Sequence, residues 1–266
     1  MLYTVPQLRT IHVDRYVLPL REGGSMPGLI EADDGLKYVI KFRGAAQGPK
    51  VLIAELIGGE IARALGLNMP ILVFAELDKS FGRTEPDQEI QNQLKASAGL
   101  NIGLRYLSGS SMFDPTVTPV DPELASLIVW LDCLIANPDR TASNPNMLIW
   151  NNKLWLIDHG AALFFHYTWD HPPAEQAQRP FARVKHHVLL PRASMLEATD
   201  IKCRAVLMED VILDIVNMIP DDWLKDDSPF RSADEHKQAY KQYLLSRIEH
   251  STKFVKEANH ARKESI

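Results

Sequence analysis

The chain has 266 residues and a mass of 30.0 kDa, and its 29 Lys and Arg against 34 Asp and Glu give a net charge of −5. Hydrophobic residues make up 45% of the chain, which is typical of a soluble globular protein with one large domain or two small ones. The mildly acidic balance excludes the broad basic field of a nucleic-acid-binding protein. The longest apolar stretch, residues 124–136, is interrupted by Asp132 and is shorter than the roughly 20 apolar residues that cross a bilayer.

The cysteine content and the N-terminal sequence indicate the compartment. Cys133 and Cys203 each lie in an apolar helical pattern, and two buried thiols are typical of a reducing cytoplasm. The first twenty residues lack the apolar segment of a secretory signal. We therefore expect a cytoplasmic protein without a membrane span.

The first hundred residues are rich in predicted strands. Residues 15–20 (RYVLPL) form the first, and a turn-dense stretch follows at residues 21–35. Residues 36–42 (LKYVIKF) alternate in character, so Asp34 and Gly35 are expected to form a hairpin turn before this strand.

A helix and further strands complete this first part. Residues 51–65 have helical periodicity, and Gly66 stands where a glycine commonly ends a helix. A strand is predicted after Pro70, a short helix over residues 87–98 and another strand over residues 100–107.

Beyond a lobe boundary at residues 107–109 the chain becomes helical. Asp121 followed by Pro122 predicts the start of a helix that runs to about Asn137. The chain then divides into residues 1–108 and 109–266. Helical patterns alternate with charged breaks from Ser194 onward, and we expect the polar tail to be frayed.

The segment with the clearest chemistry covers residues 135–163. Asp139 follows the apolar helix, and the amides of Asn144 and Asn146 precede a predicted hairpin of residues 147–150 and 154–157 that turns at Asn151-Asn152-Lys153. Asp158 ends the second strand and is followed by His159 and Gly160. Acid and amide groups before the first strand and after the second strand of a hairpin bring oxygen ligands close together. Such ligands suit Mg²⁺, with phosphates as additional ligands.

This order of helix, Asp, Asn-x-Asn, strand, turn, strand and Asp-x-Gly resembles the catalytic and metal loops of the protein-kinase-like superfamily. In particular, the chain is similar to the HipA-like kinases, a bacterial branch, and Asp139-Arg140 is also similar to the phosphatidylinositol kinases. The resemblance covers most of the chain. It implies an α+β, two-lobed protein-kinase-like fold with a strand-rich N-lobe and a mainly helical C-lobe.

The resemblance also implies the site residues. Lys41 corresponds to the strand lysine that contacts ATP phosphates, and Glu55, preferred over Glu60, to its helix glutamate partner. Asp139 corresponds to the catalytic aspartate and Asp158 to the aspartate of a DFG-type motif, here DHG.

Two parts depart from the usual pattern, and the role of Arg140 has two alternatives. The usual spacing after Asp139 selects Asn144 as the metal asparagine, whereas the Asn-x-Asn arrangement before the strand favours Asn146. Arg140 either stabilises phosphates or anchors its loop. Residues 21–28 are rich in turns without forming G-x-G-x-x-G, and within them Gly24 is expected to contact phosphate and Ser25 is a candidate autophosphorylation site. Tyr106 and Leu107 would lie in the hinge that reads adenine.

The function implied is phosphoryl transfer from ATP with Mg²⁺ to an acceptor hydroxyl. A protein Ser or Thr, including one in this chain, is the first expectation for the acceptor. A lipid headgroup or a small metabolite is the alternative, since fold alone does not fix the substrate. A non-catalytic nucleotide-binding scaffold, or a toxin–antitoxin component acting through a partner protein, belongs to a different class. Direct binding to nucleic acid is not expected.

Overall fold

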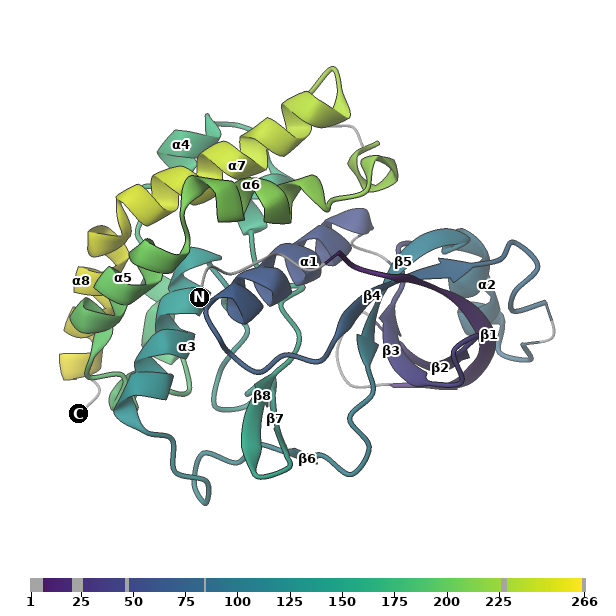
Figure 1. Ribbon diagram of the computed structural model, residues 1–266, viewed down its shortest axis with the longest axis horizontal. Helices are drawn as coiled ribbons and strands as arrows, with labels where there is room; N and C mark the ends of the chain where they lie inside the picture. The colour runs from purple at the N-terminus through teal and green to yellow at the C-terminus, as the bar shows by residue number, and fades with distance from the viewer. Residues whose placement is uncertain (1–6, 21–25, 46–47, 84, 226–228, 265–266) are drawn as a thin grey trace.

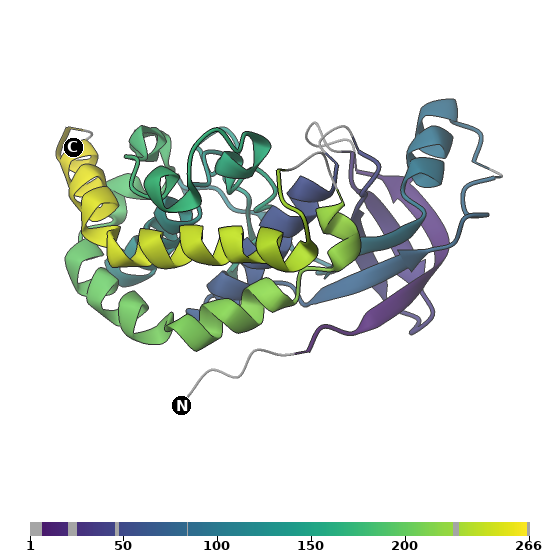
Figure 2. The same cartoon turned by 90° about the horizontal axis from the view of Figure 1, so that it is seen from above.

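The computed structural model of the protein describes residues 7–20, 26–45, 48–83, 85–225 and 229–264 (Figure 1). A β-barrel lies at one end of the molecule and a group of helices at the other, with helix α1 between them (Figures 1 and 2). The predicted candidates Gly24 and Ser25 lie outside the described residues.

Five strands form a closed barrel in the order β1-β2-β3-β5-β4. Neighbouring strands are antiparallel, except that β1 and β4 pair in parallel to close the barrel. The strands are β1 (Thr10–Pro19), β2 (Gly28–Ala32), β3 (Lys37–Lys41), β4 (Leu72–Leu77) and β5 (Gly99–Arg105).

The prediction missed β2, which lies inside the stretch read as dense in turns. Leu29 and Ile30 are buried in this strand, and the flanking glycine and acidic residues obscured its short apolar pattern. A Cβ at Gly28 would approach the ring of Tyr16 to 2.5 Å, so this strand packs too closely there for a side chain. The hairpin turn expected at Asp34-Gly35 joins β2 to β3, and Gly35 has a φ of 72°.

Helix α1 (Pro49–Ala64) is the central helix of the fold, and its residues 51–62 are all buried. It ends as predicted, with Gly66 at a φ of 80°. The short helix α2 (Gln88–Ala96) begins at Asp87, whose side chain accepts the backbone N–H groups of Glu89 and Ile90.

A three-stranded sheet and helix α3 follow. The sheet contains β6 (Ser111–Met112), β7 (Met147–Trp150) and β8 (Lys153–Leu156), and α3 spans Pro122–Leu134. Asp121 caps α3 as predicted, by accepting the N–H of Leu124. The β7–β8 turn contains two residues and not three, because Asn151 and Asn152 both have positive φ and close a tight turn.

The rest of the chain is helical, with irregular connections, and covers one side of α1 (Figure 1). The expected frayed tail is wrong as far as Glu264, because Phe254, Val255 and Ala258 bury one face of the last helix. No helix among the described residues is long and apolar enough to cross a membrane. The elements are η1 (Phe164–Tyr167), α4 (Pro173–Gln176), η2 (Ala182–His186), η3 (Leu190–Arg192), α5 (Leu196–Val206), α6 (Glu209–Asn217), η4 (Asp221–Leu224), α7 (Ala233–Glu249) and α8 (Ser251–Glu264).

Two apolar cores hold the molecule together. The smaller fills the barrel and includes Ile30, Tyr38 and Val73. The larger joins α1 to the C-terminal helices and includes Trp130. Cys133 and Cys203 are both free and buried, as expected.

Candidate active site

A cavity of about 520 Å³ lies between the barrel and the β7–β8 hairpin. Side chains from β3 and β5 line its barrel side, and the loops that flank the hairpin line the other. Seven of the predicted site residues line it, namely Lys41, Tyr106, Leu107, Asp139, Asn144, Asn146 and Asp158. Glu55 does not line the cavity but contacts Lys41. Leu20 and Pro27, on either side of the glycine-containing β1–β2 connection, also line it.

Lys41 joins the barrel, helix α1 and the segment after the hairpin. Its Nζ lies 2.6 Å from Oε2 of Glu55 and 2.5 Å from Oδ1 of Asp158. Of the two glutamates considered, Glu55 is therefore the partner, while Glu60 contacts Arg63 at 3.2 Å. Three segments far apart in the sequence meet at one ammonium group.

The charges of this group stabilise one another. Burial alone would lower the pKa of Lys41, but the carboxylates of Glu55 and Asp158 raise it above its usual value. Burial would raise the pKa of Glu55, but Lys41 and a hydrogen bond from His159 bring it well below its usual range. Lys41 is therefore a permanent cation at the wall of the cavity.

The carboxylate of Asp139 is held by both candidate asparagines. Nδ2 of Asn144 donates to Oδ2 of Asp139 at 3.0 Å, and Nδ2 of Asn146 donates to the same oxygen at 3.2 Å. The backbone N–H of Asp139 donates to Oδ1 of Asn137 at 3.1 Å. These contacts fix the carboxylate in the cavity.

The residues here fit a hard divalent cation. The amide nitrogens of Asn146 and Asn144 donate hydrogen bonds to Asp139, so their amide oxygens remain as ligand atoms. Asp158 contributes a half-exposed carboxylate. Amide and carboxylate oxygens with room for phosphate and water are the donor set that Mg²⁺ prefers. Within the described residues no group of three His, Cys, Asp or Glu forms an all-protein metal cage.

Arg140 does not line the cavity. Its guanidinium is 1% exposed and donates to Asp132 at 2.5 Å and to the carbonyl of Asn146 at 2.5 Å. A longer contact of 3.4 Å reaches the carbonyl of Ile157, just before Asp158. Of the two roles considered for Arg140, its contacts favour anchoring the loop over binding phosphate.

His159 connects the segment after β8 to helix α1. Its backbone N–H donates to Oε2 of Glu55 at 2.8 Å, and its Nε2 lies 3.2 Å from Nη2 of Arg140. A Cβ at Gly58 would come within 2.7 Å of the Cβ of His159, so the helix approaches this closely only at a glycine.

The backbone is strained where the candidate residues lie. Asn146 and Asp158 have φ values of 49° and 57°, and Ala136 and Leu163 are also left-handed. Such conformations in residues other than glycine cost energy and cluster at functional sites. Asn146 and Asp158 therefore sit in conformations that the surrounding contacts enforce.

Sequence reasoning missed the support of this site, which centres on Asp132. This aspartate is fully buried in the apolar helix α3 and accepts from Arg140, Asn137 and His187. Burial would raise its pKa, but Arg140 and His187 hold it well below its usual range. The available signal was an acidic residue in an otherwise apolar helix, which requires a buried partner.

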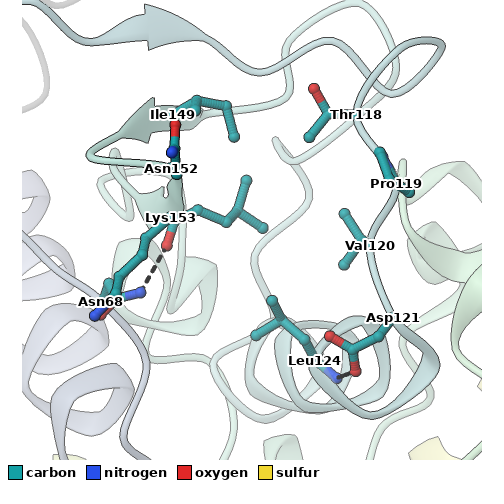
Figure 3. Close-up of a pocket in the computed structure, with 10 residues that line it drawn as sticks. Asn68, Thr118, Pro119, Val120, Asp121, Leu124, Ile149, Asn152 and Lys153 are labelled. Carbon is teal, nitrogen blue, oxygen red and sulfur yellow. Dashed lines mark hydrogen bonds between the residues drawn. The ribbon is translucent and has the colours of Figure 1, made fainter.

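A second hollow of about 480 Å³ lies between the β7–β8 hairpin and the start of α3 (Figure 3). Thr118, Val120, Leu124 and Leu154 are among its lining residues, and Asp121 there caps α3. It contains none of the predicted site residues.

Comparison with known proteins agrees with this geometry. The model of the family described as HipA-like kinase matches residues 13–257. No curated protein shows a significant sequence match.

Among solved structures, the Helicobacter pylori proinflammatory kinase CtkA aligns over 98% of this chain and 100% of its own, with 12% identity and a TM-score of 0.54. The Golgi casein kinase with Mn/ADP bound aligns over 94% of this chain and 73% of its own, with 13% identity and a TM-score of 0.46. The alignment with CtkA and the arrangement of lobes confirm the predicted two-lobed protein-kinase-like fold. With its family match over most of its length, the chain belongs to the HipA-like kinases.

Proposed function

We propose that this protein transfers the γ-phosphoryl group of ATP, with Mg²⁺, to the hydroxyl of a protein Ser or Thr. The observation that carries the proposal is the convergence of Lys41, Asp158, Asp139 and Asn146 on one cavity. Membership of a kinase family supports the reaction class. The proposal includes lobes of residues 1–108 and 109–266 and, from the two free thiols, a cytoplasmic location.

The cavity offers complementary surfaces for a nucleotide. Apolar side chains of Val39 and Leu104, with Tyr106 and Leu107 beyond β5, form a surface for adenine. Lys41 would contact the phosphates, and Leu20 and Pro27 line the same cavity. Asn146 and Asp158, with Asn144 beside them, would hold Mg²⁺, which neutralises charge on the transferring phosphoryl group.

Asp139 would orient the acceptor hydroxyl and take up its proton. The acceptor oxygen forms a bond to the γ-phosphorus as the bond to the β–γ bridging oxygen breaks, so ADP leaves with that oxygen. Arg140 would hold Asp139 and Asp158 at a fixed separation, because its guanidinium donates to the carbonyls of Asn146 and Ile157 on the two sides of the hairpin.

Substitution of the two aspartates tests the assignment. Asp139→Ala and Asp158→Ala should each lower phosphoryl transfer from γ-labelled ATP by at least about 100-fold, the usual contribution of such groups. Wild-type protein should gain thermal stability with ATP and Mg²⁺ together beyond that with Mg²⁺ alone, and Asp158→Ala should lose this gain.

The matched control is Asp214→Ala, an exposed aspartate on α6, which should retain transfer and the thermal shift. Circular dichroism should show the same helix content in all variants. Transfer that persists in either active-site variant would disprove the assigned roles. Mass spectrometry of the wild type after incubation with ATP reports whether Ser25 is modified.

A further inference from the structure

A basic segment lies between the metal-loop region and α5, and the proposed mechanism does not use it. Residues 176–196 (QAQRPFARVKHHVLLPRASML) contain four Arg or Lys and no Asp or Glu, although the whole chain has more acids than bases. Its charged residues are Arg179, Arg183, Lys185 and Arg192. This is a strong local reversal of the overall charge.

The three-residue period of a 3₁₀ turn places cations of the basic segment on its solvent-exposed face. Phe181, Val184 and His187 recur every third residue and are buried, as one face of a 3₁₀ turn requires. Arg183 and Lys185 lie between these anchors and are exposed. The turn is therefore fixed on its inner face and cationic on its outer face.

The anchors attach this surface directly to the candidate catalytic loop. His187 pairs with Thr141, two residues after Asp139, and the N–H of Val188 donates to the carbonyl of Arg140 at 3.1 Å. Nε2 of His187 lies 3.0 Å from Asp132, which also binds Arg140. The cations are thus held beside the loop that would receive the acceptor.

These cations are not matched by acidic side chains of the described parts of the chain. Arg179, Arg183, Lys185 and Arg192 are exposed and take part in no ion pair there. On the packed helix α8, the carboxylate of Glu257 accepts the backbone N–H of Phe181. The fixed positive surface therefore has its charge available to another molecule.

We propose that the basic segment docks an acidic stretch of the acceptor protein next to its phosphorylated Ser or Thr. The idea rests on the proposed function, because it places the acceptor at Asp139. Guanidinium groups bind carboxylates through paired hydrogen bonds, and uncompensated charge steers the encounter. The exposed side chains of η2 are not large apolar groups, which an interfacial membrane site needs, so an acidic protein is favoured over a lipid surface.

Direct binding tests the docking surface without relying on catalysis. The probe is a fluorescent Ser-containing peptide with flanking Asp residues, compared by anisotropy with the same peptide carrying Asn in their place. The wild type should bind the Asp peptide about tenfold more tightly at low salt, and Arg183→Glu/Lys185→Glu should remove the difference. The control is Lys79→Glu/Arg204→Glu, which reverses two exposed charges elsewhere and should bind as the wild type does.

The outcomes separate docking from catalysis. Equal affinity of the wild type for both peptides, or an equal loss in the control variant, would overturn the proposed surface. Binding of the wild type to anionic vesicles without binding to the Asp peptide would also overturn it, because that result would indicate a membrane surface as the partner. Charge-dependent binding by a protein without phosphoryl transfer would support the surface and contradict the proposed function. If both stand, the charge-reversed variant should lose transfer to the Asp peptide mainly through a higher KM.

Discussion

The imidazole of His159 occupies the position where helix α1, the loop that contains Asp139 and the segment that follows β8 meet. It is fully buried, it receives a hydrogen bond from Arg140 and it packs against Gly58. Because Nε2 accepts from a guanidinium, the ring proton resides on Nδ1, on the side of Glu55. The imidazole thus lies between the guanidinium of Arg140 and the carboxylate of Glu55.

Replacement of His159 by Phe keeps an aromatic ring but removes this acceptor. The buried N–H of Arg140 then lacks its partner, so we expect His159→Phe to lower the free energy of unfolding by about 1–3 kcal/mol in urea denaturation. His171→Phe changes an exposed histidine and should have a far smaller effect. Equal stability of His159→Phe and the wild type would show that the Arg140–His159 contact contributes nothing.

The residues that sequence reasoning found and missed differ in how they are encoded. Asp139, Asn146 and Asp158 follow one another within a short segment, so their order could be recognised directly. Asp132, His159 and His187 act through pairings that span up to 104 positions in the sequence. Such long-range partners leave no local pattern, and only the burial of a polar group hints at them.

At the scale of elements, η4 connects the C-terminal helices to the barrel. The indole of Trp223 is buried, donates to the carbonyl of Leu100 on β5 at 2.9 Å and packs edge-on against Phe74 on β4. Beside it, Asp222 forms an ion pair with Arg43 at the end of β3. One short turn therefore contacts three regions of the barrel.

The apolar contact of η4 should contribute more to the free energy of unfolding than its ion pair does. Trp223→Ala removes a large buried ring, and we expect a loss of about 3–5 kcal/mol in the free energy of unfolding. Asp222→Asn removes a partly exposed ion pair and should cost less than about 1 kcal/mol. Chemical denaturation of both variants compares them, and similar losses would contradict this ranking.

Elements with strong local signals were predicted well. Helix α1 has its terminal glycine, α3 has its Asp-Pro start, and the β7–β8 hairpin has asparagines in its turn. Strand β2 and helix α8 depend on tertiary burial, which gives a glycine-containing strand and a polar tail their structure. Closure of the barrel by parallel β1 and β4 pairs distant segments and is invisible to local patterns.

For the molecule as a whole, stability should depend on pH through His166. This histidine is buried, and Nδ1 lies 3.0 Å from the hydroxyl of Tyr240. Burial, with smaller contributions from Lys50 and His236, lowers its pKa well below the usual 6.5. The folded protein therefore keeps His166 neutral where the unfolded chain binds a proton.

The sign follows from proton linkage. Below pH 6.5 the unfolded state binds more protons than the folded state. His166 should therefore lower the free energy of unfolding by up to about 1.4 kcal/mol for each unit by which the pH decreases. His166→Phe should show a correspondingly shallower slope between pH 6.5 and 5, in denaturant titrations at several pH values. That window lies above 4.5, the usual pKa of Glu55, below which the stability contributed by its buried ion pair begins to decline. His171→Asn should leave the slope unchanged, and an unchanged slope in His166→Phe would contradict the prediction.

The closed barrel and the hairpin also bear on self-association. Every barrel strand has a neighbour on both sides, so the barrel offers no open edge to another chain. Asn68 covers the outer edge of β8. Its carbonyl accepts the N–H of Leu156 at 2.9 Å. Its Nδ2 donates to the carbonyl of Leu154 at 3.0 Å (Figure 3). One asparagine thus takes the place of an adjacent strand, and it protects the hairpin beside the candidate active site from intermolecular β-pairing.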